Sequence, residues 1–324
     1  MRKKLLGAEH PSTLKVMGNL AATYSIQGRW NEVEQLRGQV MDMSKKLLGA
    51  EHLDALTIMG SLAITYSSQG MWNEAEQLEV QVMDMSKKLL GAEHPDTLRI
   101  MGNLAITYSG QGRWNEAEQL RVQVMDMSKK LLGAEHPGTL KIMGNLAITY
   151  SGQGRWNEAE QLEVQVMDIS KKLLGAEHPD TLKIMRGLAI TYSIQGRWNE
   201  AEQLQVQVMD ISKKLLGAEH PDTLRSMESL ASTYSEQGRW NEAEQLQVQV
   251  MDMSKKLLGA EHPDTLRIME NLASTYNEQG RWNEAEHLQV LIISIKKKLL
   301  GPEDPGTLMS MDDLARIYHN KGVE

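Results

Sequence analysis

The sequence lacks cysteine and phenylalanine altogether, and proline accounts for only 8 of its 324 residues. The absence of cysteine excludes disulfide bonds and thiol chemistry. Such a composition is typical of a reducing compartment, so we expect a cytoplasmic protein. No apolar run approaches the roughly 18 residues that a membrane-spanning helix requires, so we expect no membrane partner. Only two leucines precede Gly7 in the opening residues MRKKLLGAEHP, and we expect no signal peptide there.

Basic charge is also scarce. The formal net charge is -8 at pH 7, from 35 basic and 43 acidic side chains. A nucleic-acid partner would need a basic face against its phosphates. The sequence therefore predicts no nucleic-acid binding.

What the chain has instead is a period of 42 residues. The segment from Pro95 to His136 and the segment from Pro137 to His178 agree at 38 of their 42 positions. All seven tryptophans and all eight tyrosines fall in the same register. Self-similarity at a fixed period of this length predicts a stacked solenoid of repeats rather than a globular enzyme domain.

The period also sets the expected domain boundaries. Residues 1–10 match the end of a repeat, residues 11–304 hold seven repeats, and residues 305–324 match the first half of another. This last half keeps the apolar pattern at Leu308, Met311, Leu314 and Tyr318. The second half of that repeat, which is expected to cover this apolar face, is missing. Two interpretations remain open: a piece of a longer array, or end-to-end stacking between chains.

Each repeat is predicted to form two helices. Apolar residues recur at helical spacing after Pro95, and Gly112 is a stop signal, which together predict a first helix. Asn115 and Glu118 are spaced as a capping box, which predicts a second helix from Asn115 to Leu132. The expected core is Leu98, Met101, Leu104, Ala105 and Tyr108 from the first helix and Ala117, Leu120, Val124, Met127 and Leu131 from the second.

The residues Leu104-Ala105, Tyr108, Gln111-Gly112 and Asn115-Glu116-Ala117 resemble the tetratricopeptide repeat. The 42-residue length is similar to the repeats of kinesin light chains and of C-terminal arrays in fungal and bacterial signalling NTPases. This resemblance implies an all-α, right-handed α-α superhelical solenoid of antiparallel helix pairs, with a concave groove that binds extended peptides or partner helices. The chain departs from the family at Arg121, where an aromatic is usual, and at Val124, where alanine is usual. It carries no heptad segment and no GxxxxGK[ST] loop.

Differences between the repeats gather on one face of the first helix, at positions four residues apart. The resemblance implies that this face lines the groove and that asparagines beside it hold a ligand backbone through their amides. The face is small and apolar in the early repeats and acidic in the later ones, which suits a ligand with apolar and basic segments. The candidate binding residues are Gly102, Asn103, Ile106, Gly144, Asn145, Ile148, Arg186, Ile190, Glu228, Glu236, Glu270, Asn271 and Glu278.

Two features of this face have competing explanations. Glycine inside a helix costs about 1 kcal/mol relative to alanine. Gly102 and its equivalents therefore reflect either close approach of a ligand backbone or simple inheritance by duplication. Arg225 and Arg267 could face the groove, but we favour solvated charges that pair with Glu228 and Glu270 at a spacing of three residues.

Other repeated residues are interpreted as structural. Equivalent residues of stacked repeats lie on the order of 10 Å apart, whereas zinc ligands lie about 2 Å from one ion. The histidine series at His10, His52, His94, His136, His178, His220 and His262 is therefore expected to cap or pack the turn before each first helix. The methionines are expected to pack the core, and Trp114 to pack at a helix junction. We expect no cofactor and no metal.

We therefore expect a non-enzymatic scaffold that binds a protein or peptide in its groove. The alternative is a structural spacer or self-assembling rod, a homo-oligomer formed by end-to-end stacking. An enzyme ranks third, because no catalytic constellation is recognisable.

Overall fold

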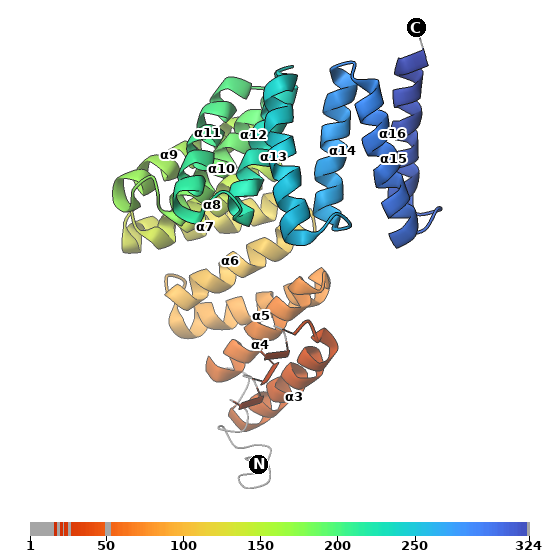
Figure 1. Cartoon of the computed structure of the whole chain (residues 1–324). Helices are drawn as coiled ribbons and strands as arrows, with labels where there is room; N and C mark the ends of the chain where they lie inside the picture. Colours follow the sequence, from red (N-terminus) through yellow and green to blue (C-terminus); the bar gives the residue numbers. More distant parts are fainter. Residues whose placement is uncertain (1–15, 18–19, 22, 25–26, 49–52, 323–324) are drawn as a thin grey trace. The chain divides into compact units, whose positions relative to one another are not determined.

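The computed structural model of the chain describes residues 16–322 apart from residues 18–19, 22, 25–26 and 49–52. The described residues form fourteen helices, α3 to α16, and contain no strand (Figure 1). The predicted tail of a repeat at residues 1–10 lies outside the described residues. None of the helices that these residues form is long and apolar enough to cross a membrane.

The chain divides into two compact units, residues 1–169 and 170–324. The first contains α3 (Trp30–Leu48), α4 (Leu53–Ser68), α5 (Trp72–Leu90), α6 (Pro95–Gly110), α7 (Trp114–Leu132), α8 (Pro137–Gly152) and most of α9 (Trp156–Leu174). The second contains the end of α9, α10 (Pro179–Ile194), α11 (Trp198–Leu216), α12 (Pro221–Glu236), α13 (Trp240–Leu258), α14 (Pro263–Glu278), α15 (Trp282–Leu299) and α16 (Pro305–Gly322).

Consecutive helices pack against one another from α3 to α8 in the first unit and from α10 to α16 in the second (Figure 1). First helices that begin at proline alternate with longer second helices that begin at tryptophan, 16 residues for α6 against 19 for α7. The predicted all-α solenoid of helix pairs is confirmed.

The predicted core of the first helices is confirmed at Leu98, Met101, Leu104 and Ala105, whereas Tyr108 is only partly buried. Met101 and Ala105 are fully buried and Leu104 is 1% exposed. The same methionine position is fully buried in each full repeat from α4 onward, at Met59, Met101, Met143, Met185, Met227 and Met269. The methionines at this position therefore pack the core, as predicted.

The second helices bury less than predicted. Ala117 and Val124 are buried, but Leu120 and Met127 are only partly buried, and Leu131 is 44% exposed. The prediction for Leu131 was wrong. The second helix is three residues longer than its 16-residue neighbours, so its last turn has little surface to pack against.

The turns between helices use the predicted histidine and glycine. His94 Nδ1 accepts a hydrogen bond from the Asp96 backbone N–H at 3.2 Å, capping α6. Gly112 adopts a φ of +75°, in the left-handed region that favours glycine, and the next N–H then bonds back to the Tyr108 carbonyl at 2.8 Å. The capping role is confirmed at His94, His136, His178, His220 and His262, whereas His10 and His52 lie outside the described residues.

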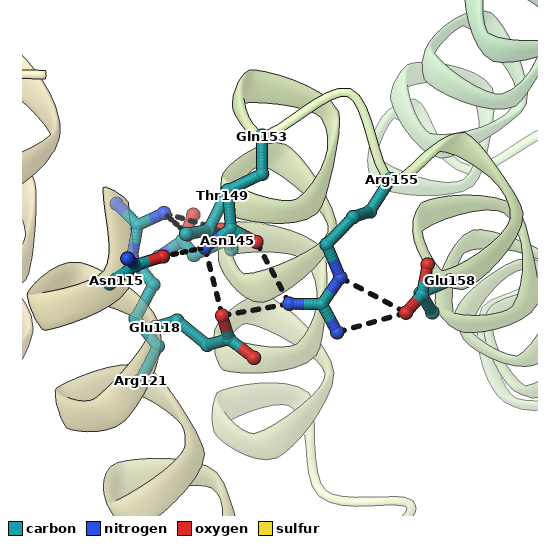
Figure 2. A network of polar contacts seen from close by, with 8 residues as sticks. All are labelled: Asn115, Glu118, Arg121, Asn145, Thr149, Gln153, Arg155 and Glu158. Atoms are coloured by element: carbon teal, nitrogen blue, oxygen red, sulfur yellow. Dashed lines mark hydrogen bonds and ion pairs between the residues drawn. The ribbon is translucent and has the colours of Figure 1, made fainter. Parts of the chain in front are cut away.

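The predicted capping box at Asn115 and Glu118 was wrong. Helix α7 begins one residue earlier, at Trp114, and its N-cap Arg113 makes no side-chain cap. Asn115 and Glu118 instead accept hydrogen bonds from Gln153 Nε2 of the following repeat, at 3.1 and 2.8 Å (Figure 2). Because Asn115 is already inside the helix, it is too far along the chain to cap the first turn.

Trp114 packs at a helix junction, as predicted, and the structure shows that the junction is with the following repeat. A Cβ atom added to Gly152, at the end of α8, would lie 2.6 Å from the Trp114 ring. The ring therefore lies directly against the backbone of the next first helix. The same relationship holds for Trp72 and Gly110, at 2.8 Å.

Candidate functional site

The small, apolar part of the predicted binding face lies on α6 and α8 in the first unit. Ile106 is 49% exposed and Ile148 is 60% exposed, and Ile64 on α4 occupies the same position at 45%. Exposed isoleucines recurring at one position of successive helices are more informative than single surface residues. We call Ile64, Ile106 and Ile148 the isoleucine row.

The glycines beside this row face open space. A Cβ atom added to Gly102 or Gly144 would have no neighbour within 4 Å. Packing inside the protein therefore does not require glycine at these positions. The two explanations for these glycines, close approach of a ligand backbone and inheritance by duplication, both agree with this open surface.

Asn103 and Asn145 follow these glycines and are partly buried. Among the described residues, neither side-chain amide has a hydrogen-bond partner. Each amide can donate and accept at once, which is what pairing with an extended backbone requires. The backbone carbonyl of Asn145 is occupied, because it accepts from Thr149 Oγ1 at 3.2 Å and from Arg121 Nη1 at 2.6 Å (Figure 2).

Arg121 belongs to a set of residues that sequence reasoning missed as a site feature. It lies on α7, is 7% exposed and also donates to Thr149 Oγ1 of α8. We call this position the floor position; it is occupied by Glu79, Arg121, Glu163, Gln205, Gln247 and Gln289 in the described repeats from α5 onward. The sequence did contain a signal for this position, because its side chain changes between acidic, basic and amide types in repeats that are otherwise nearly identical.

Burial perturbs the charged floor residues. Desolvation lowers the pKa of Arg121 to about 10. Desolvation raises the pKa of Glu79 to about 7, although a hydrogen bond with Thr107 works in the opposite direction. Glu79 lines a pocket of about 320 Å³ between α4 and α6, together with Gly60 and Asn103.

In the second unit, α10 carries Arg186 and Ile190. Arg186 Nη1 lies 3.4 Å from Asp222 Oδ1 of the following repeat, which holds the guanidinium against α12. Ile190 is 56% exposed and Ile194, one turn further, is 52% exposed. The face of α10 therefore combines an exposed apolar surface with a cation that is already paired.

The acidic part of the predicted face forms a pocket between α12 and α14. Glu228, Glu236, Asn271 and Glu278 all line this cavity of about 530 Å³, with Gln247 from α13 at its base. Glu270 is not among the lining residues, because Lys296 Nζ and Ser310 Oγ both bond its carboxylate. The structure therefore brings four of the five predicted residues on these two helices into one site.

The predicted ion pairs on this face were wrong. Arg267 donates to Glu228 of the preceding repeat at 2.6 Å rather than to Glu270 three residues away. Glu270 pairs with Lys296. Stacking places Arg267 of α14 beside Glu228 of α12, so the guanidinium pairs with the preceding repeat and not within its own helix.

Comparisons with known proteins agree with this architecture. The sequence profile described as tetratricopeptide repeat matches residues 12–88, 80–130, 110–172, 164–214, 192–256, 229–298 and 264–322. A crystal structure of nearly identical TPR-like repeats from a Podosopora anserina putative kinesin light chain is 37% identical. The match covers 64% of this chain and 97% of that one, with a TM-score of 0.59. No curated protein matches the sequence.

Two more distant structures share the fold. BtubC (BKLC) from P. vanneervenii is 17% identical with a TM-score of 0.61, over 71% of this chain and 92% of that chain. The STAND protein with a tetratricopeptide repeat sensor from Pyrococcus horikoshii is 13% identical with a TM-score of 0.66. That match spans 99% of this chain and 48% of the larger protein.

Proposed function

Because the chain belongs to the tetratricopeptide repeat family, we propose that it is a non-enzymatic scaffold that binds an extended peptide or a partner helix. The binding face is the exposed side of the first helices. The single observation that carries this proposal is the isoleucine row beside open glycine backbone and unpaired asparagine amides.

The binding free energy would come from burial of apolar side chains and from hydrogen bonds to the backbone of the ligand. Covering an exposed isoleucine contributes about 1.5–3 kcal/mol for full burial, and less for a side chain that is half-buried already. The amides of Asn103 and Asn145 would give direction to a ligand backbone. The acidic pocket in the second unit would favour a basic segment, and that part of the binding should weaken with salt.

The test is a selection of peptides from a displayed library on the purified chain. The double variant Asn103→Ala/Asn145→Ala serves as the parallel control. We expect peptides with apolar and basic features that bind the chain and are lost on the control. If no peptides are enriched above the control, the groove is not the binding site.

A second candidate function is a structural spacer that assembles end to end. It is favoured by α16, where Leu308 is 46% exposed, Met309 68% and Tyr318 48%. A further helix, from another copy of the chain, could cover this surface. Light scattering over a range of concentrations tests this candidate, and a strictly monomeric chain at high concentration would exclude it.

A further inference from the structure

One residue of the pocket between α12 and α14 carries a buried hydrogen-bond acceptor without a partner. Gln247 is 7% exposed, and its Oε1 atom has no hydrogen-bond partner within the described part of the chain. The equivalent Gln289 differs, because its side chain is held by a hydrogen bond from Nε2 to the Ser310 carbonyl at 2.9 Å and its Oε1 is not among the buried atoms without a partner. A buried acceptor without a partner is costly and calls for an explanation, and here the residue that carries it is one of those that line a cavity.

The walls of the same pocket carry negative charge. Glu236 and Glu278 lie at equivalent positions on α12 and α14 and are both exposed. Glu236 makes no ion pair with any described residue, and the contact made by Glu278 is a long hydrogen bond of 3.5 Å from Asn277. Glu228 also lines the cavity, but Arg267 partly neutralises it.

These groups define the chemistry of an occupant. Ionised carboxylates only accept hydrogen bonds, and so does the Oε1 atom of Gln247. The occupant therefore has to be cationic and rich in N–H donors. A guanidinium presents five donors in a rigid plane, so it can bond two walls and the base together, whereas an ammonium has three donors at one point.

The rest of the pocket suits the remainder of an arginine side chain. Trp240 is also part of the lining and offers an aromatic ring, a surface on which guanidinium groups stack well. The cavity of about 530 Å³ is larger than one side chain and leaves room for neighbouring peptide backbone.

We propose that this pocket binds the arginine side chain of an extended peptide, with the guanidinium between Glu236 and Glu278 and one N–H donated to Gln247 Oε1. The proposal rests on the proposed function and names the chemistry of the partner at the acidic end. Gln247, whose role sequence reasoning did not foresee, is then the residue that distinguishes arginine from a diffuse positive charge.

The test uses the full chain and three pentapeptides, acetyl-Ala-Ala-X-Ala-Ala-amide, in which X is arginine, lysine or citrulline. Citrulline has nearly the shape of arginine without the charge. We expect the arginine peptide to bind about tenfold more tightly than the citrulline peptide, as loss of a charge-assisted hydrogen bond predicts, and more tightly than the lysine peptide. Affinities would be measured by isothermal titration calorimetry or by NMR titration.

Two variants examine the base of the pocket. Gln247→Leu should weaken arginine-peptide binding several-fold and abolish the preference over lysine. Gln205→Leu is the matched control, because Gln205 is also 7% exposed with an unpartnered Oε1 but does not line the acidic pocket. It should leave binding unchanged. The surface double variant Glu236→Gln/Glu278→Gln should reduce binding further without unfolding the chain.

The proposal is overturned if the arginine peptide does not bind, if arginine and lysine peptides bind equally, or if Gln247→Leu has no effect. These results are separable from failure of the proposed function. Library peptides that bind through Asn103 and Asn145 but show no arginine preference would leave the groove function standing. An arginine preference that depends on Gln247, without any library enrichment, would leave the pocket standing.

Discussion

Arg155 Nη1 donates to Glu118 Oε2 of the preceding repeat at 2.8 Å, and Arg155 Nε donates to Glu158 Oε1 of its own repeat at 3.0 Å (Figure 2). The same guanidinium lies 4.3 Å from the centroid of the Tyr150 ring. The arrangement recurs in both units, with Arg113 and Glu76 in the first and Arg239 and Glu202 in the second. An arginine at this position therefore joins neighbouring repeats, except in the second repeat, which carries Met71 there.

This relationship predicts that glutamates of the same helix differ in importance. Glu118→Ala removes hydrogen bonds from Gln153 and Arg155 of the next repeat, whereas Glu116→Ala removes one partner within its own repeat, Arg113. We expect Glu118→Ala to lower the thermal unfolding midpoint by on the order of 1–2 °C, because half-exposed ion pairs contribute little individually. Glu116→Ala should have a smaller effect. Equal midpoints would contradict a special role for the joint between repeats.

Glu118 also makes the stability of the fold depend on pH. Burial alone would raise the pKa of Glu118, but the hydrogen bonds from Gln153 and Arg155 and the charge of Arg155 outweigh it and lower the pKa below the ordinary value of 4.5. A lowered pKa stabilises the fold above pH 4.5, and this contribution is lost as the pH falls through the folded-state value. The deficit of Glu118→Ala should therefore shrink in acid, as unfolding midpoints between pH 3 and pH 7 would reveal.

Glu79 makes the stability of the fold depend on pH in the opposite direction. Burial raises its pKa to about 7 from an ordinary 4.5, so the fold prefers the protonated carboxyl. Stability from this group is present below pH 4.5 and is lost as the pH rises toward 7, by on the order of 3 kcal/mol in total. Glu79→Gln should therefore stabilise the chain at pH 8 and have little effect at pH 4. Urea unfolding at both pH values tests this, with the exposed Glu74→Gln as the control.

The isoleucine row predicts a separation of binding from stability. Ile148 is 60% exposed, and later repeats carry serine at its position, as Ser232 and Ser274. Ile148→Ser should therefore leave the thermal midpoint within about 1 °C, as is usual for surface substitutions. It should weaken binding of library-selected peptides by up to about tenfold, through lost burial. Unchanged affinity would remove Ile148 from the binding face.

The floor glutamines should respond oppositely to the same substitution. Gln247→Leu removes a buried acceptor that has no partner, so we expect it to stabilise the chain by about 1 kcal/mol. Gln289→Leu removes the buried hydrogen bond that the side chain donates to the Ser310 carbonyl, so we expect a loss of about 1 kcal/mol. Urea unfolding of the two variants provides the comparison. Destabilisation by both would mean that Gln247 has a structural partner in solution.

Sequence reasoning was strongest where one residue type repeats in register. The capping His94 and the left-handed Gly112 depend on contacts within one turn, and the buried Met101 and its equivalents lie on the apolar stripe that the helical period marks. Local geometry fixes such contacts, so a helical period and a turn signal are enough to predict them. The exposed face carrying Ile106 and Ile148 follows from the same period, because residues opposite a buried stripe have to face outward.

The contacts between repeats could not be obtained in this way. Asn115 and Glu118 have the spacing of a capping box, and Arg267 and Glu270 have the spacing of a helical ion pair, yet their partners are 26 to 40 residues away in sequence. A long polar side chain can reach several partners of similar energy. The way in which the repeats stack decides which of these partners is nearest. The sequence by itself determined the helices, their core and the exposed face. Only the tertiary structure placed Gln247 beneath two acidic helices, because that juxtaposition arises from packing three helices together.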